Sequence, residues 1–147
     1  MTRINSNIDP RRLTDEHLMA EHREIKRLPH CLKTRLSAKR RNTIPVRFTL
    51  GTGHVTFFLD KMAFTKDRYL RLHNECRRRG FDVQDYAENW KRVPQEYNQD
   101  YTMSDEDELI IVERIKERIE TSPKDTWHYN KEKITKEQAI NILYNGR

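Results

Sequence analysis

The chain has 147 residues, of which 35% are hydrophobic and 35% are charged, and its net charge is +6. This length suits a single domain with a modest core and a heavily charged surface. The longest apolar run, residues 55–59 broken by Thr56, is too short to span a membrane, and the polar first residues do not form a signal peptide. We therefore expect neither an integral membrane protein nor a secreted one, but a cytoplasmic protein.

The positive charge is concentrated at the start of the chain. Residues 1–50 hold 12 Lys and Arg against 5 Asp and Glu, a balance of +7. The same count gives 9 against 8 (+1) for residues 51–100 and 8 against 10 (−2) for residues 101–147. A basic N-terminal third indicates a polyanionic partner, with nucleic acid favoured. A membrane surface is disfavoured, because the chain has no basic amphipathic helix with a continuous aromatic face.

The cysteines and histidines indicate neither a disulfide framework nor a metal site. Cys31 and Cys76 are too few for such a framework, and both fall in expected helices, which is typical of reduced, partly buried thiols. His17 and His22 are five residues apart and lie on different helix faces, and an H-E-x-x-H motif is absent. We expect no bound metal. The histidines considered for zinc are His17, His22, His30 and His54.

The first expected helix begins after Thr14, a good N-cap followed by two acidic residues. Apolar residues recur at helical spacing from Leu18 to Leu32. Pro29 falls inside this pattern, so we expect the helix to kink or end near it. Residues 33–47 form a basic connector that contains Pro45, and no helix can continue through that proline.

The segment over residues 51–60 is locally ambiguous. Its β-branched and aromatic content favours a strand, but no second strand of similar quality exists to pair with it. We therefore expect a buried loop or a short helical turn. A second helix is expected from about Thr65 to Arg79, with Gly80 as its left-handed C-cap. The three consecutive arginines at 77–79 suit the dipole at its C-terminus.

A third helix is expected after Ser104, and Pro123 ends it. Four acidic residues fill its first turn, and its apolar stripe consists of Leu109, Val112, Ile115 and Ile119. Thr135 caps a short final helix that Gly146 follows. The sequence thus predicts a compact all-α domain with three main helices, long polar connectors and an additional short C-terminal helix.

Two features could carry chemistry. Removal of Met1, which a small residue at position 2 permits, exposes the α-amine of Thr2, a nucleophile with a reference pKa of about 7.7–8.0. On the first helix His17, Glu21 and Glu24 are spaced i, i+4 and i+7 and share one face. A solvated, salt-bridged face is the commoner reason for such a pattern. The residues 51–53, Gly-Thr-Gly, lack the Gly-Lys-Ser/Thr of a phosphate loop and favour a chain reversal.

These patterns alone indicate a small α-helical protein that binds nucleic acid, and they do not decide between an enzyme and a passive binder. Four blocks then show a family resemblance: residues 2–5 (Thr-Arg-Ile-Asn), 17–24 (His-Leu-Met-Ala-Glu-His-Arg-Glu), 51–61 (Gly-Thr-Gly-His-Val-Thr-Phe-Phe-Leu-Asp-Lys) and 75–81 (Glu-Cys-Arg-Arg-Arg-Gly-Phe). Together with Pro94–Tyr97 and Trp127, they resemble the pyrimidine-dimer DNA glycosylases of the bacteriophage endonuclease V type. The resemblance covers residues 1 to about 130.

The resemblance implies a fold and a mechanism. Members of this family are single all-α domains whose N-terminal segment threads between helices to reach the DNA. The Thr2 α-amine attacks the anomeric carbon of the damaged nucleotide, an imine forms, and β-elimination cleaves the strand. Glu24 matches the essential glutamate of the family. The family's DNA-contacting positions match Arg3, His17, Arg23, Arg27, Arg114, Arg118 and Trp127.

The resemblance further implies a monomer that needs no cofactor, acts on damaged double-stranded DNA in a bacterium or a phage-infected cell, and flips a base out of the duplex. We expect a glycosylase-like domain over residues 1–130 and a C-terminal extension over 131–147. Lys26 replaces a proline usual in the family, and His128 stands where a tyrosine is common. Two alternatives stay open: the same lyase chemistry on another damaged or modified base, and a DNA-binding protein without catalysis.

Overall fold

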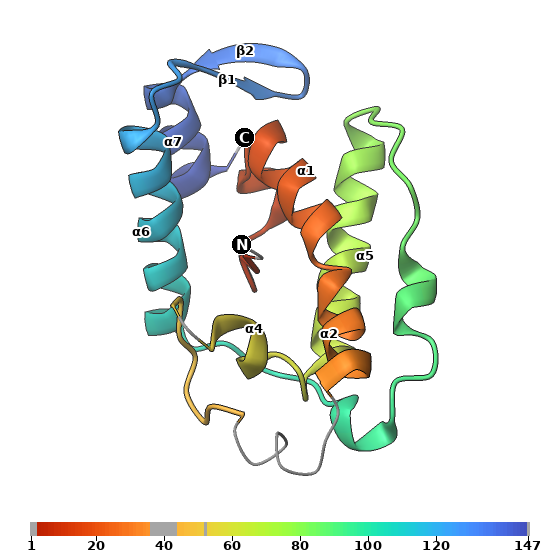
Figure 1. Cartoon of the computed structure of the whole chain (residues 1–147). Coiled ribbons are helices and arrows are strands. Elements are labelled where there is room, and N and C mark those ends of the chain that lie inside the picture. The colour runs from red at the N-terminus through yellow and green to blue at the C-terminus, as the bar shows by residue number, and fades with distance from the viewer. Residues whose placement is uncertain (1–2, 36–43, 52, 147) are drawn as a thin grey trace.

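The structure, a computed structural model, describes residues 3–35, 44–51 and 53–146, with the side chains of residues 33–35 excepted. It is mostly helical, as the sequence predicts, with one small sheet (Figure 1). The helices are α1 (Asp15–Glu24), α2 (Arg27–Arg35), α4 (His54–Phe57), α5 (Met62–Arg78), α6 (Asp105–Thr121) and α7 (Lys136–Asn145). The strands are β1 (Thr126–Tyr129) and β2 (Glu132–Thr135). Short 3-10 turns lie at Pro10–Arg12, Ala87–Trp90 and Gln95–Tyr97.

The helices form two groups with the N-terminal segment between them. Figure 1 shows α1, α2 and α5 side by side, α6 and α7 packed together opposite them, and the start of the chain in the middle. Ile4 and Ile8 of this segment are completely buried. The expectation that the N-terminal segment threads between helices is therefore confirmed. Within the described part of the chain, no helix is both long and apolar enough to cross a membrane.

The break between α1 and α2 precedes Pro29 instead of following it. Pro29 lacks an N–H, and its ring would collide with the carbonyl of Ile25 in a continuous helix. The backbone therefore leaves the helix after Glu24 and starts again at Arg27, so that Pro29 lies in the first turn of α2, where a missing N–H costs little. The predicted kink exists, and its position follows from this local clash.

The segment that we expected to be a buried loop or a short helical turn contains the short helix α4. Gly53 precedes α4 with a φ of 95°, a left-handed conformation that side chains rarely adopt. A Cβ atom at this position would also lie 3.4 Å from Cγ of Pro45. Because Gly53 accepts this conformation, the chain can reverse and bring His54, Phe57 and Phe58 into the core.

The sequence did not predict the β1–β2 hairpin. Its turn residues Asn130 and Lys131 have φ values of 51° and 70°, as a two-residue hairpin turn requires. The second of them is a lysine where glycine is the usual signal. The backbone N–H groups of both residues donate to the carboxylate of Asp15, at 3.0 and 2.8 Å. A contact more than 100 residues away in sequence thus stabilises a turn that has no local signature.

The C-terminal extension belongs to the same packed body. α7 begins with a complete capping box at Thr135 and Gln138, and it packs on α6 and on the turn at residues 10–12. Nε of Arg12 donates to the carbonyl oxygen of Leu143 at 2.6 Å. The expected domain boundary at residue 130 falls inside the hairpin turn, so β1 and the extension are joined through the sheet.

Arg79, the last of the three consecutive arginines, is buried at the C-terminal end of α5. The Arg79 guanidinium donates to Asp15 at 2.8 Å, to Glu75 at 2.7 Å and to the carbonyl of Pro10 at 3.1 Å. It also lies 4.2 Å from the centre of the Tyr129 ring. The helix-dipole explanation is therefore insufficient for Arg79, which joins α1, α5 and the hairpin.

We predict that Arg79→Met lowers the free energy of unfolding by about 3–5 kcal/mol, because it leaves the buried carboxylate of Asp15 without its cation and removes one of the two arginines that pair with Glu75. Arg77 is exposed on the same helix, so Arg77→Met is the matched control and should change stability by less than about 0.5 kcal/mol. Urea denaturation measures both. Equal effects of the two substitutions would contradict the role given to Arg79.

Candidate active site

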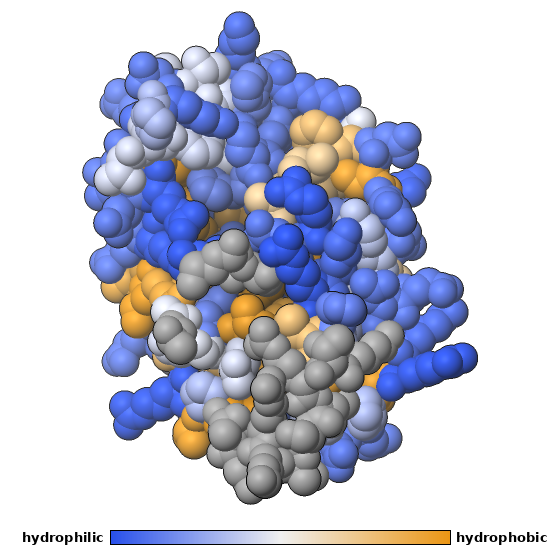
Figure 2. Space-filling model, in the orientation of Figure 1, coloured by the Kyte–Doolittle hydropathy of each residue, from blue (hydrophilic) through white to orange (hydrophobic). Residues whose placement is uncertain are grey.

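A cavity of about 110 Å³ lies where the N-terminal segment, α1 and α6 meet. It is lined by Arg3, Asn5, His17, Ala20, Glu21, Glu24, Arg114, Ile115 and Arg118. Figure 2 shows that hydrophilic side chains predominate on the face seen in Figure 1, with smaller hydrophobic patches between them. Five of the predicted site residues therefore converge from three distant parts of the sequence: Arg3, His17, Glu24, Arg114 and Arg118.

The contribution of α1 follows from helical spacing. His17, Glu21 and Glu24 all line the cavity, as their predicted common face requires. Thr14 caps the helix by accepting the N–H of His17 at 3.2 Å, which fixes where this face begins. Ala20 lies on the same face, and its small side chain leaves space between the larger ones.

The two glutamates of this face have different surroundings. Glu21 is 2% exposed, and its carboxylate accepts two hydrogen bonds from the Arg68 guanidinium, at 2.8 and 2.9 Å. It also accepts the backbone N–H of Asn5 at 3.1 Å and the side-chain amide of Asn5 at 2.9 Å. Every lone pair that Glu21 can offer is thus used in holding the fold together.

Glu24 is half-buried, and its carboxylate makes no hydrogen bond to any other residue in the described ranges. It opens onto the cavity, and its charge is near enough to that of Arg3 to favour the guanidinium form. A carboxylate that borders a cavity and has no hydrogen bond to the described residues around it is available for chemistry on a bound molecule.

The arginines around the cavity are not fully neutralised. Arg114 is 9% exposed; its Nη2 donates to Oδ1 of Asn5 at 2.8 Å, while its buried Nη1 has no partner among the described residues. Burial and the nearby charges of Arg3 and Arg118 lower the pKa of Arg114 to about 10. Burial and Arg118 also lower the pKa of Arg3. Excess positive charge with a free donor is suited to an anionic ligand such as a phosphate.

His17 links the cavity to the hairpin. Its ring stacks on Trp127, with centroids 5.2 Å apart and an interplanar angle of 14°. Its Nδ1 lies 3.0 Å from the Thr14 hydroxyl oxygen. Burial, followed by the charge of Arg118, lowers the pKa of His17 to about 4, so the ring is neutral near pH 7. Trp127 is 6% exposed and its ring lies under the ammonium group of Lys124, which gives it a packing role in this conformation.

Of the other predicted residues, Arg23, Arg27 and Trp127 lie outside the cavity lining, whereas Arg118 is part of it. Arg23 and Arg27 are exposed on α1 and α2, which leaves them accessible to a large ligand. Arg118 is exposed at the cavity edge. Thr2 lies outside the described residues.

Three further residues that reach the N-terminal segment were not predicted: Asn5, His54 and Arg68. Asn5 bridges Glu21 and Arg114, and His54 accepts the backbone N–H of Ile4. The sequence does not indicate that Arg68 is buried, because α5 carries many other charged residues. The two closely spaced glycines at 51 and 53 could have indicated that another backbone segment approaches there. They could not have indicated that this segment is the N-terminal one.

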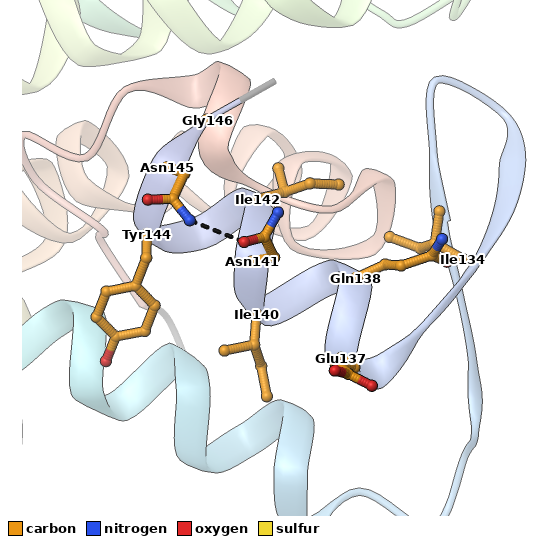
Figure 3. A pocket seen from close by; sticks show the side chains of 9 residues that line it. All are labelled: Ile134, Glu137, Gln138, Ile140, Asn141, Ile142, Tyr144, Asn145 and Gly146. Atoms are coloured by element: carbon orange, nitrogen blue, oxygen red, sulfur yellow. Dashed lines mark hydrogen bonds between the residues drawn. The ribbon is translucent and has the colours of Figure 1, made fainter.

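A larger hollow of about 650 Å³ lies along α7 (Figure 3). Figure 3 shows amide side chains such as Asn141 and Asn145, which bond to each other at 2.8 Å, beside the aliphatic side chain of Ile140. None of its nine lining residues is a lysine or an arginine. The smaller cavity is therefore the better candidate for a polyanionic ligand. Among the described residues, no three or more His, Cys, Asp or Glu side chains are grouped to hold a metal ion.

The domain is mostly helical, and its cationic recess holds one carboxylate without a hydrogen-bond partner among the described residues. This arrangement is suited to an anionic ligand. The family model for pyrimidine dimer DNA glycosylases matches residues 1–89, and the chain belongs to that family. The family is one of DNA-repair enzymes, which implies that the substrate is DNA. The matched residues include the N-terminal segment, α1 and α4.

We predict that three histidines stay neutral well below pH 6.5. Burial is the main cause that lowers the pKa of His17, His22 and His54 from 6.5 to about 4. The unfolded chain then binds protons between pH 6.5 and about 4 that the folded protein does not bind, so the free energy of unfolding falls as the pH falls through this window. An NMR titration of the imidazole signals measures each group. Titration of all three near 6.5 would contradict the burial that the structure shows.

Proposed function

We propose that the protein is a glycosylase and apurinic/apyrimidinic lyase that uses the α-amine of Thr2 as its nucleophile and Glu24 as its acid–base group. The observation that carries this proposal is that Arg3 and Glu24 line one small cavity. Consecutive residues are at most about 3.6 Å apart along the chain, so the amine of Thr2 can only be about that far from the backbone of Arg3. In this proposal the amine reaches the carboxylate of Glu24, which has no hydrogen-bond partner among the described residues.

The chemistry follows from these two groups. The amine lone pair attacks C1′ of the damaged nucleotide, and the glycosidic bond breaks with its electron pair leaving on the base. Opening of the sugar gives an imine between the amine and C1′. Loss of a proton from C2′ then expels the 3′ phosphate by β-elimination, and water releases the amine. Glu24 stabilises the positive charge that develops on the sugar and transfers protons during elimination.

The cavity arginines supply substrate binding and favour a reactive amine. Arg3 and Arg114 offer donors to phosphate or sugar oxygens, and Nη1 of Arg114 has no hydrogen-bond partner among the described residues. Positive charges nearby disfavour an ammonium group and so favour the deprotonated, nucleophilic amine. Contacts between arginines and phosphates also make the affinity for DNA depend steeply on salt.

Glu24 distinguishes this proposal from a DNA-binding protein without catalysis. A carboxylate inside a phosphate-binding recess repels the ligand, so a passive binder gains nothing from it. The second alternative, the same chemistry on another damaged or modified base, concerns substrate choice. Cleavage of duplexes that carry a pyrimidine dimer, an abasic site or a modified base distinguishes a dimer-specific enzyme from one that acts on another base. Membership of the family favours the dimer.

We predict that borohydride traps the protein covalently on DNA with an abasic site, because reduction fixes the imine. Protein that retains Met1, or that has one residue added before Thr2, is the control, and it should give no adduct since its amine is displaced. Gel electrophoresis under denaturing conditions measures the adduct. Absence of an adduct with the processed protein would favour the non-catalytic alternative.

We predict that Glu24→Gln lowers strand cleavage by at least about 10²-fold while lesion binding is kept, because the change removes a charge but little volume. Glu117 is exposed on α6 and does not line the cavity, so Glu117→Gln is the matched control. Single-turnover cleavage and a binding titration at fixed salt measure the two effects. Full activity of Glu24→Gln would remove this residue from the mechanism.

A further inference from the structure

Two side chains from different elements fix two consecutive backbone N–H groups of the N-terminal segment. The N–H of Ile4 donates to Nε2 of His54 at 3.0 Å, and the N–H of Asn5 donates to Oε2 of Glu21 at 3.1 Å. All four residues are buried. Two adjacent peptide groups held from two sides leave the backbone little freedom to rotate at this point.

The hydrogen bonds of His54 define its tautomer. Nδ1 donates to the carbonyl oxygen of Thr49 at 2.8 Å, so Nε2 carries a lone pair and can accept the N–H of Ile4. The Phe48 and Phe58 rings lie nearly perpendicular to the imidazole, with centroids 5.6 and 5.4 Å away. The ring has one position and one protonation pattern in which both of its hydrogen bonds form.

The groups that face His54 keep this tautomer in place. Burial lowers the pKa of His54 to about 4, and the charges of Arg114 and Arg3 act in the same direction. The hydrogen bond to Thr49 and the charge of Glu21 act in the opposite direction and are outweighed. The imidazole therefore remains a hydrogen-bond acceptor across the pH range in which a DNA-repair enzyme works.

The turn at residues 49–54 holds the neighbouring residue as well. Nη1 of Arg3 donates to the carbonyl oxygen of Leu50 at 3.5 Å. The left-handed Gly53 makes this turn tight enough for Thr49 and His54 to hydrogen-bond. Leu50 and His54, which flank the Gly-Thr-Gly sequence that is no phosphate loop, thus hydrogen-bond to Arg3 and Ile4.

We propose that His54 is a positioning residue for the N-terminal nucleophile. The inference rests on the proposed use of the Thr2 α-amine. His54 fixes the peptide group of Ile4, two residues after Thr2, and so sets the direction in which the chain enters the cavity beside Glu24. Since a misplacement of about 1 Å between reacting groups can cost about 10²-fold in rate, the acceptor on His54 acts on the rate of imine formation more than on DNA affinity.

The chain offers a matched control for the loss of a buried imidazole. His22 is 2% exposed, as His54 is, and burial likewise lowers its pKa to about 4. Its ring contacts His73, Tyr69 and Tyr86 on the side of α1 that faces α5. A general effect of removing a buried histidine should therefore appear equally in a His22 variant.

The test compares His54→Phe, His54→Gln and His22→Phe with the unaltered protein. Phenylalanine keeps the ring but removes the acceptor, whereas the amide oxygen of glutamine can still accept the N–H of Ile4. Two quantities are measured: the single-turnover rate constant of borohydride trapping on abasic DNA, and the affinity for DNA with a tetrahydrofuran analogue that cannot form an imine. Circular dichroism at the assay temperature confirms that each variant is folded.

We expect His54→Phe to slow trapping by at least about 10-fold with an affinity within about 3-fold of the unaltered protein, and His54→Gln to restore most of the rate. His22→Phe should trap at the normal rate. Equal trapping by folded His54→Phe and the unaltered protein overturns the inference, as does equal slowing in His22→Phe. If His54→Phe does not fold, His54→Gln decides, and the amide proton shift of Ile4 shows whether glutamine accepts that N–H. A normal trapping rate with the acceptor in place, or a slow rate with the acceptor lost, supports the inference. A normal rate with the acceptor lost, or a slow rate with the acceptor in place, overturns it. Absence of trapping with the unaltered protein would instead overturn the proposed function.

Discussion

The buried carboxylate of Glu21 is the interaction on which the arrangement of this protein depends. It joins α1, the N-terminal segment and α5, because it accepts from Asn5 and from Arg68 at the same time. Asn5 extends the connection to Arg114 on α6, and Arg68 also donates to the carbonyl of Ile8. An unpaired charge at this depth would be strongly destabilising, so these segments must come together for the carboxylate to be buried.

The same arrangement separates structure from chemistry on one helix face. Glu21 and Glu24 are three residues apart, and both reach the cavity. The former is fully hydrogen-bonded, and the latter has no hydrogen-bond partner in the part of the chain that the structure describes. A single turn of helix therefore carries both the group that anchors the N-terminal segment and the group that we propose acts on the substrate beside it.

Local signals made much of the fold predictable. Caps at Thr14, Ser104 and Thr135 gave the starts of three helices, and helical spacing gave the shared face of α1. The hairpin had no such signal, because its turn depends on Asp15 from a distant part of the chain. A long-range contact of this kind leaves no trace in the spacing of neighbouring residues.

The candidate site was predictable in part for the same reason. The resemblance supplied Arg3, His17, Glu24, Arg114 and Arg118, and the structure brings all five to one cavity. The buried roles of the supporting residues could not be read from the sequence. A buried arginine on α5 has the same sequence context as the exposed arginines around it, and only its position in the packed protein separates them.

The most direct measurement is to map the reduced DNA adduct within the protein by mass spectrometry. If the N-terminal segment is held so that its amine faces the cavity, the deoxyribose-derived mass will be on the α-nitrogen of Thr2 in the N-terminal peptide. An adduct on a lysine side chain, with the N-terminal peptide unmodified, would contradict this account.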